Sequence, residues 1–256
     1  MPLSEIRKDY IQDKYVIIAR MKGGKPRDTV ECNPVPTPRP CGFCPEKSDA
    51  EKSLLDIRGK KRWIIRVLPN KYPVVSPENT RAYGIQEVVI ETPHHEAQLD
   101  ELSEDHVAKL FQVYAARTRA ISKNKKIEYI LIFKNSGGRA GASLQHSHSQ
   151  IFATHFLPPH LLDKSQKTQA YKLRTGRCIY CDVIKKERRG PRAVFEDDTV
   201  TAFTPWASLY NYELWILPKR HLDNITLLNA RERASWARIL KRALHKIVGL
   251  GLPYNF

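Results

Sequence analysis

The chain has 256 residues, of which 41% are apolar and 27% are charged, so a globular protein with a substantial core is expected. No apolar run approaches the roughly 18 residues of a membrane-spanning helix, and the first residues lack the pattern of a secretion signal. This excludes a membrane-embedded chain and predicts a cytoplasmic location.

The formal net charge of +16 favours an anionic partner, such as a nucleotide, a phosphorylated sugar or a nucleic acid. The alternative is a basic surface that is simply solvated. Basic runs such as "GKKRW", "KNKK" and "KKERRGPR" are spread along the chain instead of forming one tail, which argues against nucleic acid.

Two related sets of elements follow one another along the chain. The first has "CGFC" at 41, strands within 61–75 and 83–103, and a helix over 104–124. Its histidines 94 and 95 follow the second strand. Apolar residues recur in this helix at the three-to-four spacing of a buried face. They are Val107, Leu110, Phe111, Val113 and Tyr114.

The second set has "CIYC" at 178, strands within 193–210 and 211–229, a histidine at 221 and a helix over 230–248. Short β-rich runs ended by proline, such as "ELWILP", are typical of strands. The apolar face of this helix consists of Trp236, Ile239, Leu240, Ala243, Leu244 and Ile247.

After its helix the first set continues through "KIEYILIFKNSGG" into "LQHSHSQIFAT", two further strands, whereas the second reaches "GLGLPYNF" and ends. We therefore expect an α+β fold of two diverged repeats with antiparallel sheets. The expected parts are a first repeat over 1–155, a linker with a tandem proline over 156–177, and an incomplete second repeat over 178–256.

Four of the five cysteines form two C-x-x-C pairs, Cys41 with Cys44 and Cys178 with Cys181. In a chain without a secretion signal, such pairs more often bind metal or carry out redox chemistry than form structural disulfides. The unpaired Cys32 is interpreted as a structural thiol.

Structural zinc takes four ligands from cysteine and histidine. For the first pair, the missing ligands must come from His94 or His95 and from His146. We expect the set Cys41, Cys44, His95 and His146, and a redox pair or two buried thiols are the alternatives.

For the second pair, His221 is the third candidate ligand. A fourth would come from strands that the second set lacks. His245 lies mid-helix, where a core or surface histidine is expected. The second metal site, Cys178, Cys181 and His221, is therefore predicted to be incomplete or absent.

The stretch "NSGGRAGASLQHSHSQ" places histidines at alternate positions after a glycine-rich run. If "QHSHSQI" is extended, His146, His148 and Gln150 share one face. Polar residues on both faces make a poor core strand, which indicates a site. A neutral imidazole is a good nucleophile toward phosphorus, and the glycine loop with Arg139 suits a phosphate. The alternative is a solvated loop without function.

The motifs "CGFC", "RVLPNKYP", "ETPHHE", "NSGGRAGASLQHSHSQ" and "WILPKRH" together resemble the galactose-1-phosphate uridylyltransferase family, a branch of the histidine-triad superfamily. The resemblance runs from about residue 5 to the end of the chain. Ser147 and Ser149 replace the proline and glycine of typical uridylyltransferases. This makes the chain more similar to the branch with ADP-glucose phosphorylase-like and archaeal members.

The resemblance implies a double displacement at phosphorus. His148 would attack the α-phosphate of a UDP-hexose and form a nucleotidyl-histidine, and a hexose 1-phosphate or inorganic phosphate would then take the nucleotidyl group. Gln150 matches the family glutamine that hydrogen-bonds the phosphoryl oxygens.

The same resemblance assigns substrate contacts to Asn135 and Ser143 at the phosphates, to Asn70 at the ribose or base, and to Lys25 near the phosphates. It assigns structural zinc to Cys41, Cys44, His95 and His146, and it implies a homodimer.

Three alternatives to the uridylyltransferase reading stay open. One is a phosphorylase of ADP-glucose or a dinucleoside polyphosphate, because base choice depends on shape. Another is a truncated nucleotide-binding protein with little turnover. The third is a basic zinc module that binds nucleic acid, which would bind in a salt-sensitive way.

Overall fold

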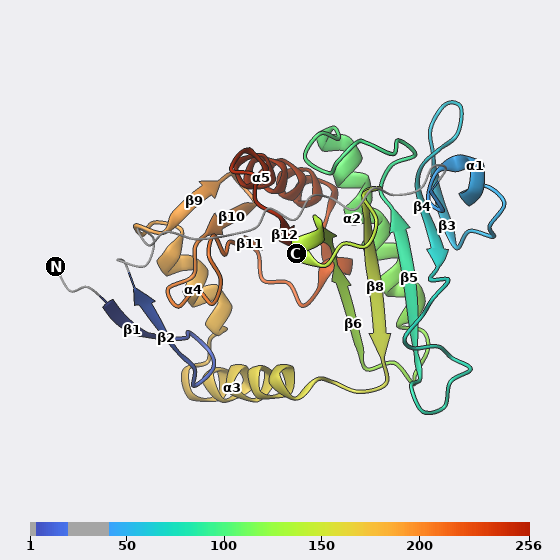
Figure 1. Cartoon of the computed structure of the whole chain (residues 1–256). Coiled ribbons are helices and arrows are strands. Elements are labelled where there is room, and N and C mark those ends of the chain that lie inside the picture. The colour runs from blue at the N-terminus through green and yellow to red at the C-terminus, as the bar shows by residue number, and fades with distance from the viewer. Residues whose placement is uncertain (1–3, 20–40) are drawn as a thin grey trace. The chain divides into compact units, whose positions relative to one another are not determined.

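The computed structural model describes residues 4–19 and 41–256 (Figure 1). These residues form two compact units. One consists of the described part of Met1–Glu31 together with Pro158–His221, and the other of the described part of Cys32–Leu157 together with Leu222–Phe256. Within the described ranges, no helix has the length and apolar character needed to cross a membrane.

The second unit contains a five-stranded sheet in the order β3-β4-β5-β8-β6, in which every neighbouring pair is antiparallel. The predicted α+β class with antiparallel sheets is confirmed. The strands are β3 (Leu55–Arg58), β4 (Trp63–Pro69), β5 (Gly84–Ile90), β6 (Tyr129–Phe133) and β8 (His148–Thr154).

Two long helices belong to the same unit, α2 (Glu104–Ile121) and α5 (Ala230–Gly249), close to the predicted ranges. Ser103 caps α2 by accepting from the His106 backbone N–H, and Asn229 forms a capping box at the start of α5. All five predicted apolar positions of α2 are buried, and α2 packs against α5, where the rings of Phe111 and Trp236 lie 5.6 Å apart.

Helix α2 covers the sheet face behind β5 and β8 (Figure 1). Arg117 on α2 donates two hydrogen bonds, 2.8 and 2.6 Å long, to the carboxylate of Glu87 on β5. The two-stranded β7 (Asn135–Ser136) and β12 (Tyr254–Asn255) pair in antiparallel fashion, so the last residues lie beside the segment that follows β6.

The first unit combines a hairpin, a three-stranded antiparallel sheet in the order β11-β10-β9, and two helices. Its core contains Ile11, Val183 and Phe203, with Trp215 packed against them. The elements are β1 (Ser4–Lys8), β2 (Tyr15–Ala19), α3 (Pro159–Thr175), α4 (Ile179–Glu187), β9 (Ala193–Glu196), β10 (Val200–Phe203) and β11 (Trp215–Pro218).

The segment 156–177, predicted as a linker, contains helix α3. The tandem proline that suggested an irregular linker starts this helix instead, with Pro158 at the N-cap and Pro159 in the first turn. Proline suits this place because the first helical N–H groups have no intrahelical partner. One boundary between the compact units, from Leu157 to Pro158, falls within this segment, and a second follows His221, so that α5 belongs to the same unit as α2.

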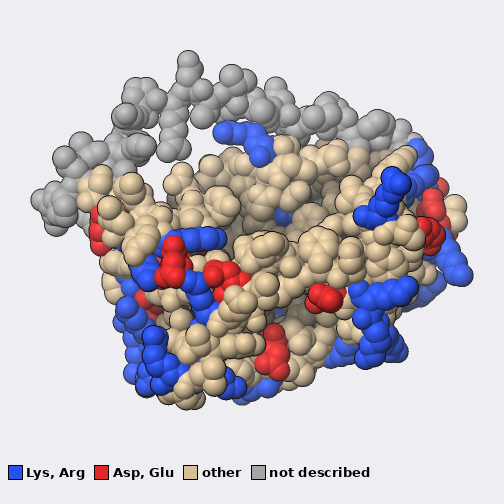
Figure 2. Space-filling view, turned by 90° about the horizontal axis from the view of Figure 1, so that it is seen from below, with Lys and Arg blue, Asp and Glu red and all other residues tan. Residues whose placement is uncertain are grey.

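Lysine and arginine side chains on the face drawn in Figure 2 form several separate groups, with aspartate and glutamate among them. This matches the scatter of basic runs along the sequence. The positive charge on this face is not gathered into one patch.

Candidate functional site

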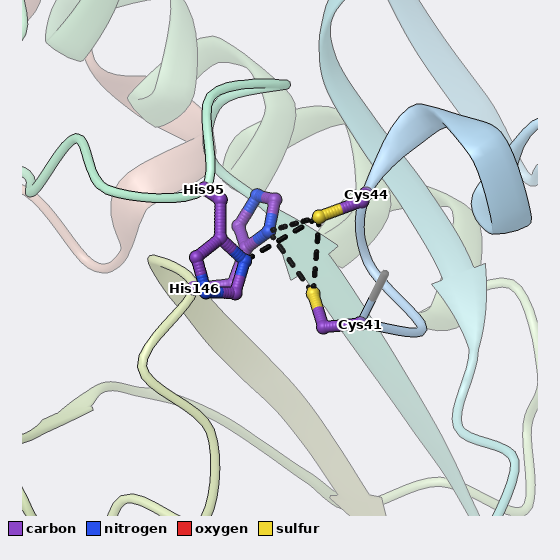
Figure 3. A group of neighbouring side chains, drawn as sticks. All are labelled: Cys41, Cys44, His95 and His146. Carbon is purple, nitrogen blue, oxygen red and sulfur yellow. Dashed lines mark hydrogen bonds between the residues drawn. The ribbon is translucent and has the colours of Figure 1, made fainter. Parts of the chain in front are cut away.

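Four predicted metal ligands meet at one end of the five-stranded sheet (Figure 3). Cys41 and Cys44 come from a tight turn, closed by a 3.1 Å hydrogen bond from the Cys44 N–H to the Cys41 carbonyl, that leads into the short α1 (Pro45–Ser48). His95 lies in the loop after β5, and His146 lies two residues before β8. Three segments distant in sequence are thus joined.

The distances within this group are short. Cys41 Sγ lies 3.3 Å from Cys44 Sγ and 3.4 Å from His146 Nδ1. Cys44 Sγ lies 3.4 Å from His95 Nδ1 and 3.7 Å from His146 Nδ1. All four donor atoms lie within 4.8 Å of one another, so the group could hold a metal ion.

The protonation pattern of the group also suits a metal. His146 Nε2 lies 2.7 Å from the Thr92 carbonyl, which can only accept, so Nε2 carries the hydrogen and Nδ1 directs its lone pair at the thiols. Burial lowers the pKa of His146 and so favours its neutral form. The histidine is therefore held neutral, as a metal ligand must be.

His148 is the first residue of β8 and lies on the same face as His146 and Gln150. It is buried, with 8% of its surface exposed. Its Nδ1 donates to the His146 carbonyl over 2.8 Å, which leaves the lone pair on Nε2. Burial, with a smaller effect of Lys134, lowers the pKa of His148. The ring of Phe43, between the two cysteines, packs edge-on against it at 5.1 Å. The imidazole is thus neutral and fixed in one tautomer.

Gln150 lies two residues farther along β8. Its Oε1 accepts hydrogen bonds from Gln86 Nε2 at 2.8 Å and from Asn70 Nδ2 at 3.3 Å. With the oxygen occupied, the amide NH₂ is the group of Gln150 left to donate to a ligand. Sequence reasoning missed Gln86, whose only signal was a polar residue at an inward position of a β-rich run.

The glycine-rich loop after β7 makes a short 3-10 turn, Gly138–Ala140, flanked by two glycines with positive φ, Gly137 (88°) and Gly141 (85°). This conformation favours glycine. Arg139 and Ser143 are exposed on the loop. The N–H groups of Ala140, Gly141 and Ala142 bond to carbonyls within the loop, so the Arg139 guanidinium is the main group that the loop can present to an anion.

Asn255 near the end of the chain was not predicted as a site residue. Its Nδ2 donates to Asn135 Oδ1 at 2.7 Å and to the Ala140 carbonyl at 2.8 Å, so it links β12 to the glycine loop. No local sequence pattern marks such a contact across 120 residues. Lys25 and Cys32 lie outside the described residues.

The second predicted group, in the first unit, has three members. Cys178 occupies the N-cap position of α4 without a capping side-chain hydrogen bond, Cys181 lies in the first turn, and Cys181 Sγ is 3.3 Å from His221 Nδ1. The three donor atoms lie within 4.8 Å of one another, and within residues 4–19 and 41–256 no fourth ligand-type side chain joins them. The incompleteness of this second group stays a prediction.

The sequence is similar to those of several known proteins. The family model "Galactose-1-phosphate uridyl transferase, N-terminal domain" matches residues 75–158. ADP-glucose phosphorylase of Arabidopsis thaliana is 30% identical over 98% of this chain and 77% of its own length. Galactose-1-phosphate uridylyltransferase of Thermotoga maritima is 33% identical over 62% of this chain and 49% of its own length.

Solved structures show the same likeness. The crystal structure of the Arabidopsis thaliana ADP-glucose phosphorylase with bound ADP-glucose superposes with a TM-score of 0.86 at 29% identity, covering 98% of this chain and 80% of that chain. A uridylyltransferase structure gives a TM-score of 0.73 at 30% identity, covering 98% of this chain and 78% of that chain.

The chain belongs to the galactose-1-phosphate uridylyltransferase family. The predicted family, and the prediction of a nucleotidyltransferase-type enzyme, are confirmed. The chain spans about half the length of the curated uridylyltransferases of Thermotoga maritima (49%) and Haemophilus influenzae (52%) that it matches.

Proposed function

We propose that the chain moves a nucleoside monophosphate from a nucleotide sugar to a phosphate acceptor through a covalent bond to His148. The observation that carries this proposal is the fixed tautomer of His148. Because Nδ1 donates to the His146 carbonyl, Nε2 presents its lone pair. An unprotonated nitrogen is what attack on phosphorus requires.

The proposed reaction has two displacements. First, His148 Nε2 forms a bond to the α-phosphorus while the bond from that phosphorus to the bridging oxygen breaks, and sugar 1-phosphate leaves with the bonding electrons. Then an oxygen of the acceptor phosphate bonds to the same phosphorus, and the bond to Nε2 breaks. The free amide NH₂ of Gln150 donates to the phosphoryl oxygens in both steps.

The substrate contacts proposed for Asn70, Asn135, Arg139 and Ser143 are supported by their positions. Asn70 donates to Gln150, and Asn135 lies at the base of the glycine loop that carries Arg139 and Ser143. A guanidinium on a loop of this kind can bind phosphate. Lys25 is proposed as a further phosphate contact on the resemblance alone.

We propose structural zinc at Cys41, Cys44, His95 and His146. Two thiolates and two imidazoles are a donor set that tetrahedral zinc prefers. When bound, the ion would tie the loop after β5 and the start of β8 to the "CGFC" turn. In this role the metal takes no part in the displacement steps, and Cys178, Cys181 and His221 are at most a weaker second site.

UDP-hexose and hexose 1-phosphate, of the UDP-glucose and galactose 1-phosphate type, are the first substrates proposed, after the curated uridylyltransferase relatives. A second candidate is phosphorolysis of ADP-glucose, in which inorganic phosphate is the acceptor. The match to ADP-glucose phosphorylase over 98% of the chain favours it. A homodimer and a cytoplasmic location stay predictions.

The test is to incubate the chain with UDP-glucose, UDP-galactose or ADP-glucose, each labelled at either the α- or the β-phosphate. We expect acid-labile label on the protein from α-labelled substrate only, because the β-phosphate leaves with the sugar. His148→Asn should abolish it, whereas His155→Asn, a change at an exposed histidine, should not. Label that persists on the His148→Asn variant contradicts the proposal, and the most reactive substrate identifies the base.

A further inference from the structure

At the start of β8, the face that points away from the site carries two serines, before Ile151 and Ala153 continue it as apolar core. Ser147 and Ser149 alternate with the histidines, and only 2% and 1% of their surfaces are exposed. They point into the interior behind the nucleophile, where Ser149 Oγ lies 2.6 Å from the hydroxyl of Tyr114 on α2. Hydroxyls buried in this way must be satisfied by partners.

The centre of this polar interior is Lys134, the residue after β6, with 1% of its surface exposed. Its ammonium donates to Glu91 Oε2 at 2.8 Å, to Ser147 Oγ at 3.0 Å and to the carbonyl of His148 at 3.1 Å. Ser147 in turn donates to Glu91 at 2.6 Å. All three donors of the ammonium are therefore used.

The bond to the His148 carbonyl takes the place of a missing sheet contact. The register of β6 against β8 ends at Phe133 and Gln150, so no β6 residue stands opposite His148. The Lys134 backbone pairs instead with Phe256, through bonds of 2.7 and 3.1 Å. The side chain of Lys134, and not its backbone, therefore contacts β8, through the hydrogen bond to the His148 carbonyl.

Stability alone does not account for this ion pair. Burying two charges costs several kcal/mol, and apolar residues of similar volume are often as stable. Burial alone raises the pKa of Glu91, but Lys134 and the Ser147 hydroxyl outweigh it, so the pKa of the carboxyl lies below its ordinary value. Glu91 is therefore ionised and holds Lys134 in place.

We propose that Lys134, held by Glu91, is a positioning residue for the proposed reaction: it fixes the backbone of His148 and so directs Nε2 at the phosphorus. This inference rests on the proposed function of His148. It predicts a role in the rate of attack, and not in nucleotide affinity, because neither residue reaches the substrate side of β8. A misplacement of about 1 Å at a reacting atom can cost about 100-fold in rate.

The test uses the double substitution Lys134→Met with Glu91→Gln, which removes both charges together and leaves neither buried alone. The matched control is Arg117→Met with Glu87→Gln. That pair links α2 to β5, and its carboxylate is 3% exposed, but no hydrogen bond joins it to His148. The substrate is the α-labelled nucleotide sugar that reacts fastest with the wild-type chain. Single-turnover labelling over a range of its concentrations gives the rate of adduct formation and the affinity for the nucleotide sugar separately.

We expect the Lys134/Glu91 variant to keep its bound zinc and its nucleotide affinity within about threefold, while the rate of adduct formation falls about 10- to 100-fold. The control should keep its rate within about twofold. An unchanged rate in the first variant, or an equal fall in the control, overturns the inference.

A milder variant, Ser147→Ala, covers the case in which the double variant does not fold. It removes one contact of the ammonium without stranding a charge, and the rate should fall about threefold to tenfold. An unchanged rate in Ser147→Ala overturns the inference while the function stands. If the wild-type chain forms no adduct with any of the three substrates, the proposed function fails, and the inference fails with it.

Discussion

The two C-x-x-C groups begin alike and differ in what completes them. Around "CGFC", His95 and His146 bring the donor set to four, and the two cysteines and His146 are buried. Around "CIYC", only His221 joins within the described residues, and the group is more exposed. The C-x-x-C turn is therefore a common starting point, and the histidine before β8 is what makes the first group complete.

The two groups also differ in their neighbours, because the first lies beside the proposed nucleophile His148. Phe43 of "CGFC" touches the ring of His148, whereas Tyr180, at the same place in "CIYC", packs on the core of the first unit. The first group thus lies next to the proposed nucleophile, and the second lies against an apolar cluster. The predictions below test this contrast.

The largest effect is expected from loss of the cysteines. Cys41→Ser with Cys44→Ser should abolish binding of the proposed zinc and lower the free energy of unfolding by on the order of 5 kcal/mol, because structural zinc binding is coupled to folding. Cys178→Ser with Cys181→Ser should have a much smaller effect. Zinc content by atomic emission and urea unfolding check this, and equal losses in the two variants would contradict the contrast.

The aromatic residues inside the two turns give the next effect. Phe43→Ala should lower the free energy of unfolding by about 2 kcal/mol and slow adduct formation about tenfold, since it removes the ring that packs against His148. Tyr180→Ala should destabilise the chain to a similar extent and leave the labelling rate unchanged. Labelling reactions quenched at set times measure the rate of adduct formation in both variants. A slower rate in Tyr180→Ala would contradict the contrast between the two turns.

A smaller effect is expected at Gln86, which orients the amide of Gln150. Gln86→Leu removes the shorter of the two hydrogen bonds to the Gln150 oxygen and loosens the amide, so the rate of nucleotidyl transfer should fall roughly threefold to tenfold. The melting temperature should change little. A variant as fast as the wild type would show that Gln150 is held without Gln86.

The smallest effect concerns an exposed ion pair in the first unit. Lys167 and Lys8 lower the pKa of Asp13 to about 2. Because the pKa in the folded state is depressed, this contribution to stability is present above the ordinary pKa near 3.8 and is lost as the pH falls toward 2. Urea midpoints at pH 5 and pH 2.5 should differ less in Asp13→Asn than in the wild type, and high salt should remove the difference.

Periodicity and local motifs predicted much of the fold. The ranges of α2 and α5 followed from apolar spacing, and the meeting of Cys41, Cys44, His95 and His146 followed from donor types that zinc prefers. These signals are local or depend on residue type alone. Helix α3 was missed because a tandem proline reads equally as a linker or as a helix start.

The contacts that hold the site could not be predicted in the same way. Lys134 and Glu91 lie 43 positions apart, and Asn255 lies 120 positions from Asn135. Each is an ordinary residue type in its own segment. Only the strand order, with β8 inserted between β5 and β6, brings Lys134 and Glu91 to the strand of the proposed nucleophile.

The most direct test of the central claim is to identify the residue that carries the nucleotidyl group. The wild-type chain is mixed with the nucleotide sugar that labels it, digested at alkaline pH, where a phosphoramidate bond survives, and mapped by tandem mass spectrometry. The account predicts the nucleotidyl mass on His148 and on no other residue. The same mass on His146, on His221 or on no peptide of a labelled chain would contradict it.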